Sequence, residues 1–150
     1  LYQQLSLLKK HARAILAGTV TGVLTTMATV LVLALLFQLT HEQYVTFLPK
    51  SITTAIGMGV SEEMGGIVTI TVACIIITGI IGNIIAETVC RLFHITEPVA
   101  KGIAIGSASH AIGTTKAMEM GEIEGAMSSL AIAVSGLCTV LFASVFANFI

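Results

Sequence analysis

The 150-residue chain is strongly apolar, with 55% hydrophobic residues, 10% charged residues and a mean hydropathy of +0.99. Soluble domains carry roughly 25% charged residues, so this composition excludes an ordinary soluble domain and indicates a protein that sits in a lipid bilayer. The net charge of −1 offers no basic surface, and nucleic acid is therefore not an expected partner. The three cysteines, Cys74, Cys90 and Cys138, are widely spaced and fit neither a disulfide framework nor a zinc pattern.

Three stretches contain no Asp, Glu, Lys, Arg or His: residues 14–40, 64–86 and 125–150. Each is longer than the roughly 20 residues that a helix needs to cross the hydrocarbon core of a bilayer. We therefore expect three transmembrane helices within one membrane domain that covers residues 1–150. The predicted fold class is an all-α, polytopic integral membrane protein.

Basic residues cluster in two segments, and their distribution predicts the orientation in the membrane. They are Lys9, Lys10 and Arg13 before the first span, and Arg91 and Lys101 in the segment 87–101. The positive-inside rule places both segments on the cytoplasmic side. The segment 39–47 has no Lys or Arg and is predicted to be an external loop.

Two polar, glycine-rich blocks separate the spans, at residues 49–63 and 102–120. The first would be about 22 Å long as a helix, which is too short to cross the membrane. Both blocks are therefore expected to dip into the bilayer as broken or re-entrant segments, from opposite faces. Paired interrupted segments of this kind indicate an inverted-repeat transporter with a central binding site. The alternative is a pair of surface hairpins, although interfacial helices usually carry Trp, Phe and Leu rather than small residues.

The first block begins with a group of residues suited to binding an anion: Pro49, Lys50, Ser51, Thr53 and Thr54. Proline favours the first turn of a helix, and a helix start offers free N–H groups and partial positive charge. Together with a lysine and hydroxyl groups, this start predicts a site for a small carboxylate substrate. Alternatively, Lys50 extends to the headgroups and the hydroxyls bond to their own backbone.

The second block contains Ser107, Ser109, His110 and Thr114, all candidate substrate-binding residues. In a continuous helix, Ser107, His110 and Thr114 would lie on one stripe. A histidine at membrane depth is a candidate for substrate hydrogen bonding or for carrying a proton. The alternative, that the histidine bonds to a neighbouring helix, is equally open. Ser109 next to His110 does not form a hydrolase motif of the Gly-x-Ser-x-Gly type, and no enzyme activity, cofactor or metal site is expected.

Other polar and small residues are predicted to be structural. Lys116 is expected to pair with Glu119 or Glu122, and Glu122 and Glu124 are expected to form a solvated edge of the last span. Three GxxxG spacings, which favour close helix packing, are Gly18 with Gly22, Gly102 with Gly106, and Gly121 with Gly125.

The stretches "PKSITTAIGM", "GGI" and "KGIAIGSASHAIGTTKAMEMGEIEGAMSSLA" closely resemble the LrgB/CidB family of bacterial membrane proteins. Relatives of this family include the plastid glycolate/glycerate transporter of plants. The likeness extends over essentially all 150 residues and corresponds to the C-terminal portion of the family, so N-terminal membrane segments are expected to be missing here. Where many members have proline after the Thr-Thr pair, this chain has Ala55.

The resemblance implies two functions. One is transport of small monocarboxylates of the glycolate, glycerate or pyruvate class across the bacterial cytoplasmic membrane, with multiple membrane passes. The other is antiholin-like regulation of murein hydrolase export or activity, and hence of autolysis, together with a small holin-like LrgA/CidA partner. A homo-oligomer is also expected.

Overall fold

A computed structural model of the chain describes the backbone of residues 5–150 and the side chains of residues 11–150, so the side chains of Lys9 and Lys10 lie outside the described residues. The described residues form only helices: α1 (Leu5–Leu36), α2 (His41–Phe47), α3 (Thr54–Glu63), α4 (Val68–Leu92), α5 (Pro98–Met120), α6 (Glu122–Phe146) and the 3-10 helix η2 (Ala147–Phe149). Three segments are long and apolar enough to cross a membrane: His11–Leu36, Val68–Leu92 and Glu122–Phe149. The expected all-α membrane fold with three spans is confirmed.

The segment 39–47 is not the external loop that we expected. It forms the capped helix α2, in which Thr40 accepts a hydrogen bond from the backbone N–H of Gln43 and the Gln43 side chain accepts one from the Thr40 N–H. This reciprocal arrangement is a capping box. Tyr44 is fully buried, so α2 is an inward-running arm of the fold rather than a solvated connection.

The spans α1 and α4 end in the same way. Each is followed by one non-glycine residue with positive φ, Gln38 at 52° and His94 at 53°. In each, two N–H groups beyond the helix bond back to its last turn: Leu39 to Ala34 (2.9 Å), Gln38 to Leu35 (3.4 Å), Ile95 to Cys90 (2.8 Å) and His94 to Arg91 (3.2 Å). This is the Schellman pattern. It turns the chain back towards the molecule at both ends.

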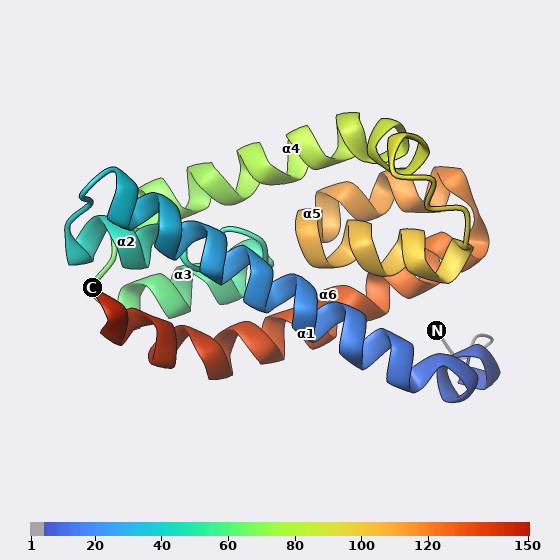
Figure 1. The fold of residues 1–150 in the computed structure, drawn as a ribbon, viewed down its shortest axis with the longest axis horizontal. Helices are drawn as coiled ribbons and strands as arrows, with labels where there is room; N and C mark the ends of the chain where they lie inside the picture. Colours follow the sequence, from blue (N-terminus) through green and yellow to red (C-terminus); the bar gives the residue numbers. More distant parts are fainter. Residues whose placement is uncertain (1–4) are drawn as a thin grey trace.

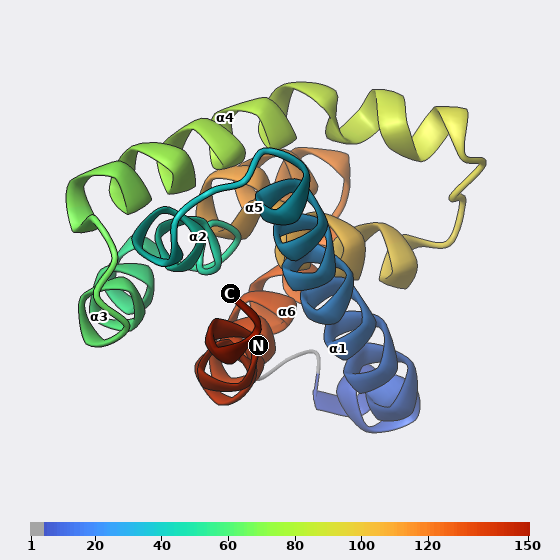
Figure 2. The same ribbon diagram turned by 60° about the vertical axis from the view of Figure 1, so that its left-hand side comes forward.

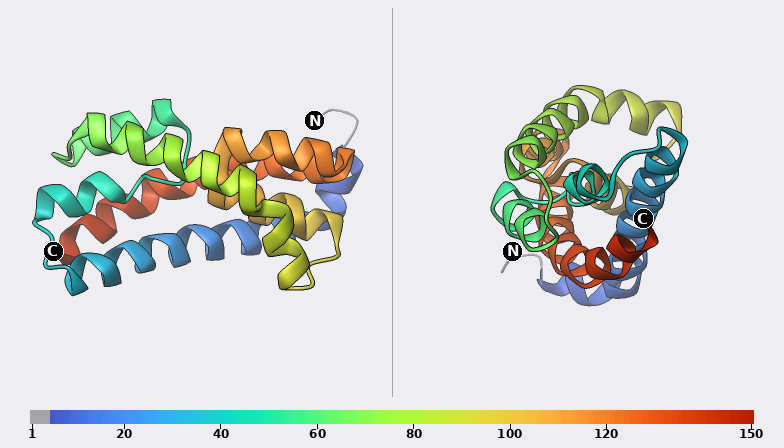
Figure 3. Two further views of the ribbon diagram at one scale, coloured as in Figure 1. Left: turned by 90° about the horizontal axis from the view of Figure 1, so that it is seen from above. Right: turned by 90° about the vertical axis from the view of Figure 1, so that its left-hand side faces the viewer.

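After each of these turns comes a helical hairpin with a break at its tip. The first hairpin consists of α2, the break 48–53 and α3. The second consists of the two arms of α5, 98–109 and 111–120, around His110, whose φ of 42° and ψ of −143° interrupt the helix. Figures 1 and 3 show that the hairpins enter from opposite ends of the long axis and that their tips point towards the middle. The predicted inverted arrangement of two broken segments is confirmed.

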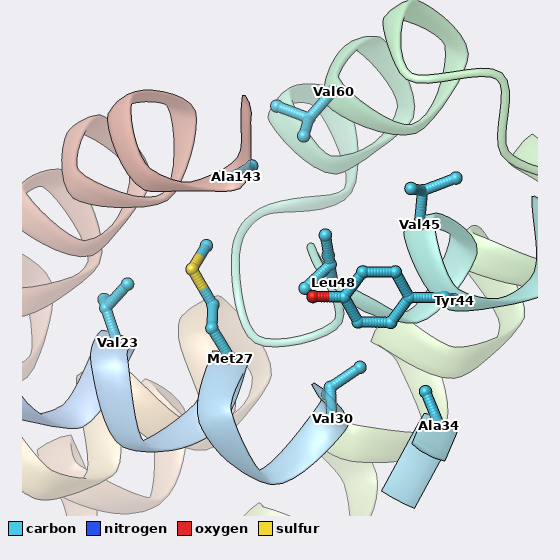
Figure 4. Packing of buried hydrophobic residues seen from close by; sticks show 9 residues of the cluster. All are labelled: Val23, Met27, Val30, Ala34, Tyr44, Val45, Leu48, Val60 and Ala143. Atoms are coloured by element: carbon cyan, nitrogen blue, oxygen red, sulfur yellow. The ribbon is translucent and has the colours of Figure 1, made fainter. Parts of the chain in front are cut away.

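An apolar cluster fixes the first hairpin between the spans. Figure 4 shows Tyr44 and Leu48 of the first hairpin facing Met27 and Val30 of α1. The Tyr44 hydroxyl also donates a hydrogen bond of 2.9 Å to the backbone carbonyl of Phe146 at the end of α6. The first hairpin is thereby held to both α1 and α6.

A buried hydroxyl network ties the same hairpin to the start of α4. The Thr71 hydroxyl donates to the Thr46 carbonyl at 2.9 Å and lies 2.7 Å from the Ser61 hydroxyl. The Thr46 hydroxyl accepts a hydrogen bond of 2.8 Å from the backbone N–H of Ile67. One residue from each of α2, α3 and α4 therefore meets at this end of the molecule, and their hydroxyls satisfy one another away from water.

Glycines allow the second hairpin to pack closely against α6. A side chain at Gly102 would collide with the Glu124 carbonyl, and one at Gly106 would collide with the Ser128 carbonyl. The GxxxG spacing of these two residues therefore serves helix packing, as predicted. Gly121, by contrast, lies between α5 and α6 with φ 166° and ψ 161°, so the third spacing does not lie on one helix.

Figure 2 shows both hairpins lying along α4, the first under its beginning and the second under its end. In Figure 1 the start of α1, the end of α4 and the start of α5 lie at one end of the molecule, and α2 lies near the other. The basic residues Arg13, Arg91 and Lys101 therefore belong to the same end. This agrees with the relative placement that their distribution predicts.

Candidate functional site

The tips of the two hairpins meet at a small cavity near the middle of the molecule. It is lined by Leu48, Ser51 and Ile52 of the first break, Ser107 of the second hairpin, Val23, Thr26 and Met27 of α1, and Thr139 of α6. Its volume is about 10 Å³, which is enough for about one water molecule. Four of the eight lining residues, Thr26, Ser51, Ser107 and Thr139, carry a hydroxyl, so hydroxyl groups are present where two blocks distant in sequence meet.

The first break brings Lys50 next to Ser51. The Lys50 ammonium donates a hydrogen bond of 3.2 Å to the Ser51 hydroxyl. Ser51 is 7% exposed and Lys50 is half-buried. Among the described residues, Lys50 has no carboxylate within ion-pairing distance. A half-buried cation without a counter-charge suits the binding of an anion.

Thr53 and Thr54 begin helix α3. Thr53 occupies the N-cap position with extended backbone, but its side chain makes no capping hydrogen bond. The N–H groups of the first turn of α3 are therefore not capped by this residue and face the region of the break. Helix α3 starts directly after the break although this chain has Ala55 where many members of the LrgB/CidB family that it resembles have proline. The break therefore does not depend on a proline at this position.

The break of the second hairpin is tied to the neighbouring span. His110 is 2% exposed, and its Nε2 lies 2.8 Å from the backbone carbonyl oxygen of Ile75 in α4. Because a carbonyl only accepts, Nε2 is the donor. Gly79 leaves the space for this ring, since a Cβ there would lie 2.6 Å from Cε1 of His110. The bond to a neighbouring helix, one of the two open alternatives for His110, is therefore present.

Thr114 supports the break from the other side. Its hydroxyl donates to the carbonyl of His110 at 2.9 Å and lies 2.7 Å from the Ser128 hydroxyl of α6. The expectation that Ser107, His110 and Thr114 share one continuous helical stripe is wrong, because the helix is broken at His110. The break needs partners for backbone groups that a continuous helix would satisfy, and Thr114 supplies one.

Ser107 and Ser109 have different surroundings. Ser107 lies at the central cavity, packs against Gly22 of α1 and donates a hydrogen bond of 3.2 Å to the Ala104 carbonyl. Ser109 lies against Gly82 of α4 and Gly113 of the second arm. Of the predicted site residues, the structure thus brings Ser51 and Ser107 to one cavity, while Ser109 faces α4 instead.

Asn83 of α4 is a polar residue that the sequence analysis missed. Its side-chain amide donates to the carbonyl of Ile112 at 2.8 Å and to the Thr115 hydroxyl at 2.7 Å, just beyond the break. Asn83 lies in the stretch 64–86, which was identified by the absence of ionisable residues alone. An amide in the middle of an apolar span is a comparable signal, because it must find a partner inside the bilayer.

The two breaks also concentrate positive potential. Helix α3 begins at Thr54 and the second arm of α5 begins after His110, so two helix N-termini start in the middle of the molecule. Each N-terminus carries roughly half a positive elementary charge. Lys50, which bonds to Ser51 in the first break, adds a further positive charge to this part of the chain.

The base of the second hairpin, away from its tip at His110, carries ion pairs. Lys116 lies 3.2 Å from Glu119 and 3.4 Å from Glu87 of α4. The hydrogen bond to Glu119, followed by that to Glu87, raises the pKa of Lys116 above its ordinary value. The predicted structural pairing of Lys116 with Glu119 is confirmed. Glu124, expected at a solvated edge, is only 8% exposed: its carboxylate packs against Gly121 and its backbone carbonyl against Gly102 of the first arm of α5.

A catalytic serine–histidine pair is not formed by Ser109 and His110, since the histidine ring bonds to Ile75 and Ser109 packs on glycines. Within the part of the chain that the structure describes, no group of three or more His, Cys, Asp or Glu side chains is placed to hold a metal ion.

The sequence model of the LrgB-like family matches residues 1–149. Similar curated proteins, each named "Antiholin-like protein LrgB", come from Bacillus mycoides (strain KBAB4), Bacillus cereus (strain B4264) and Bacillus anthracis (strain CDC 684 / NRRL 3495). Each is 37% identical over 150 residues, which is 100% of this chain and 65% of the relative. No solved structure matches the chain. The family match over nearly every residue, together with these relatives, shows that the chain belongs to the LrgB-like family.

Proposed function

We propose that this protein is a membrane transporter that moves small monocarboxylates, of the glycolate, glycerate or pyruvate class, across the bacterial cytoplasmic membrane. The observation that carries the proposal is the meeting of two broken hairpins, entering from opposite ends, at a polar point between the spans. Irregular backbone at membrane depth is stable only where protein or a watery cavity satisfies it, and transporters place substrate sites at such points.

The charge at this point supports an anionic substrate. Lys50 has no carboxylate partner among the described residues, and α3 starts beside it without a side-chain cap. Under this proposal Lys50 and the N–H groups at the start of α3 hold the carboxylate, with help from Ser51, Thr53 and Thr54. The second half-helix N-terminus, after His110, adds to the same positive potential.

Hydroxyls of the second hairpin would complete the site. Ser107 already lies at the cavity and would bond to the substrate hydroxyl or carboxylate. Ser109 and Thr114 do not line the cavity in this state and would reach the substrate once the hairpin tips move. Under this proposal His110 sets the geometry of the break through its bond to Ile75 and couples transport to a proton. The substrate therefore contacts residues from both halves of the inverted repeat.

The size of the cavity implies a conformational step. About 10 Å³ holds one water molecule and excludes a three-carbon carboxylate. Substrate binding therefore requires the hairpin tips to move apart, which is the motion by which inverted-repeat transporters expose a central site to one side at a time.

The proposal is tested by measuring uptake of labelled glycolate and pyruvate into liposomes that contain the purified protein. Lys50→Ala is expected to abolish uptake and Lys50→Arg to retain part of it, because the charge is kept. The control is Arg13→Ala, an exposed basic residue at the end of the molecule. Absence of uptake of every short monocarboxylate by the wild-type protein between about pH 5 and 8 would contradict the proposal.

The printed name of the relatives, which calls them antiholin-like, favours a second candidate, an antiholin-like regulator. As the family resemblance implies, such a regulator would modulate murein hydrolase export or activity together with a small holin-like membrane partner. In this chain Gly18 packs against Ile103, and Gly102 packs against α6. These GxxxG faces are occupied internally, so a partner or a second copy would instead contact lipid-facing residues such as Ile84, which is 70% exposed.

The second candidate predicts that the protein co-purifies with the holin-like protein and that Ile84→Arg disrupts the complex. Loss of the complex with unchanged uptake in the same variant would separate regulation from transport. Size measurement of the purified protein in detergent tests the expected homo-oligomer in the same preparations.

A further inference from the structure

A second, larger cleft lies at the end of the molecule where α4 ends and α5 begins, away from the hairpin tips. Its volume is about 600 Å³, and its walls are the end of α4, the turn that follows α4, and both arms of α5. This volume is in the range of small-molecule binding sites. The central cavity of about 10 Å³ shares no lining residue with it, so the two are separate features.

The acidic residues of this cleft are already neutralised by ion pairs within the chain. Glu87 lies 3.2 Å from Arg91 and 3.4 Å from Lys116, and Glu119 lies 3.2 Å from Lys116. Two carboxylates are thereby balanced by two cations. Lys101 also lines the cleft and has no carboxylate partner among the described residues, so the cleft carries an excess of one positive charge.

The position of Lys101 increases this excess. Lys101 lies in the first turn of α5, where its N–H bonds to the carbonyl of Glu97 at 3.0 Å. A lysine near a helix N-terminus is unfavourable, because the helix dipole already places positive charge there. Glu97, at the N-cap, makes no side-chain capping bond. Glu97 supplies negative charge at this helix start but forms no ion pair with Lys101. An external anion in the cleft would bind Lys101 directly and relieve the remaining repulsion.

The surroundings of the cleft identify the kind of anion. At the end of α4, next to the cleft, Leu92 and Phe93 are 69% and 70% exposed. This end of the span is where the bilayer interface lies, since α4 is a membrane-spanning helix and Arg91 marks its basic end. A ligand that combines a negative headgroup with acyl chains fits a basic cleft bordered by exposed apolar side chains. A free anion would leave Leu92 and Phe93 unused.

We propose that this cleft binds the phosphate headgroup of an anionic phospholipid, with Lys101 as the principal contact and the acyl chains lying along the end of α4. Arg91 and Lys116 border the same cleft and hold its acidic residues in place. Basic pockets between membrane helices on the cytoplasmic side are a recognised means of binding such headgroups. The proposal does not depend on the transported substrate.

The test compares lipid binding by the protein purified in detergent, using native mass spectrometry and thermal unfolding with added phosphatidylglycerol or phosphatidylcholine. Lys101→Gln is expected to weaken phosphatidylglycerol binding by about fivefold and to leave phosphatidylcholine binding unchanged. Arg13→Gln, which removes an exposed cation at the same end but outside the cleft, is the matched control. Measurements at about 0.5 M salt suppress diffuse attraction between the basic surface and the lipid.

Retained selectivity for phosphatidylglycerol in Arg13→Gln, with loss in Lys101→Gln, supports the proposal. Equal effects of the two variants would overturn it, because the attraction would then be general surface electrostatics. Inorganic phosphate alone, at about 10 mM, forms the third arm. If it stabilises the wild-type protein as much as phosphatidylglycerol does, the site takes a free phosphate and the lipid assignment is wrong. Unfolding of both variants in phosphatidylcholine at the wild-type temperature establishes that they are folded.

Discussion

The Nε2 atom of His110 lies 2.8 Å from the backbone carbonyl oxygen of Ile75, so the break of the second hairpin is joined to the middle of the α4 span. A carbonyl accepts and cannot donate, which fixes Nε2 as the protonated nitrogen of the ring. Among the described residues the ring makes no second hydrogen bond. The other nitrogen, Nδ1, is therefore left without a hydrogen-bond partner among the described residues.

Replacing His110 separates its two roles. His110→Gln keeps a side-chain N–H donor, whereas His110→Ala removes the bond to Ile75 and leaves a space. We expect His110→Ala to lower the free energy of unfolding by about 1–3 kcal/mol and His110→Gln to lower it less. Both variants should remove the pH dependence of uptake if the ring carries the proton, as measured in liposomes between about pH 5 and 8. A pH profile unchanged in both variants would remove His110 from proton coupling.

Asn83→Ala should destabilise the second hairpin, because Asn83 donates two hydrogen bonds to the arm after the break, to Ile112 and Thr115. Loss of these bonds is expected to cost about 1–2 kcal/mol, which thermal unfolding in detergent measures. Thr115→Val removes only the second of the two partners and should cost less. If both variants unfold at the wild-type temperature, Asn83 does not hold the break.

Close packing of the second hairpin on α6 predicts a contrast between two glycines. At Gly106 a Cβ would collide with the Ser128 carbonyl, whereas at Gly59 in α3 there is open space. Gly106→Ala is expected to destabilise the fold by about 1–3 kcal/mol. Gly59→Ala should be neutral or slightly stabilising, since alanine favours a helix over glycine. Equal unfolding temperatures for the two variants would contradict the packing described.

The central cavity can be perturbed from α1 through Ser107. A Cβ at Gly22 would lie 3.0 Å from the Ser107 hydroxyl, whereas one at Gly18 would lie 3.1 Å from a methyl group of Ile103. Both substitutions are similarly tight, but only Gly22→Ala presses on a residue that lines the cavity. We expect Gly22→Ala to reduce carboxylate uptake by about tenfold and Gly18→Ala to leave uptake near the wild-type value. The reverse order would place the substrate path elsewhere.

The ion pairs of Lys116 predict a defined pH window for stability. Because Glu119 and Glu87 raise the pKa of Lys116, its contribution is fully present below the unfolded-state pKa and is lost as pH rises through the higher folded-state value. The difference in unfolding temperature between wild type and Lys116→Gln should therefore stay constant between about pH 6 and 9 and shrink above about pH 10. A difference that already falls between pH 6 and 9 would contradict the pairing.

Composition and the length of the charge-free stretches predicted the spans, because a charge-free stretch of more than about 20 residues has few alternatives to a membrane helix. The broken blocks were also predictable, since glycine-rich polar segments between spans leave backbone groups that need partners. The limits of α4 were not, because Glu87 and Arg91 bond to each other on the helix surface and extend the helix to Leu92. Charged residues were taken as the end of the span, although they lie within its last turns.

The helix α2 was missed although its capping box, Thr40 to Gln43, was readable in the sequence. The position of the second break was not readable, because no proline marks it and a histidine rarely adopts a φ of 42°. Tertiary contacts impose that conformation: Ile75 holds the ring, and Thr114 takes the carbonyl. For the same reason Ser107, His110 and Thr114 were wrongly placed on one continuous helical stripe.

The two breaks differ in length, and this has a consequence for how a transporter of this shape would work. The first tip is a segment of six residues, 48–53. The second tip is a single residue, His110, that interrupts the helix and is held by α4 and α6. If the halves of an inverted repeat exchange their conformations during a cycle, each half is a template for the other. The state opposite to this one would then have a compact first tip and a loosened second tip, open towards the other side of the bilayer.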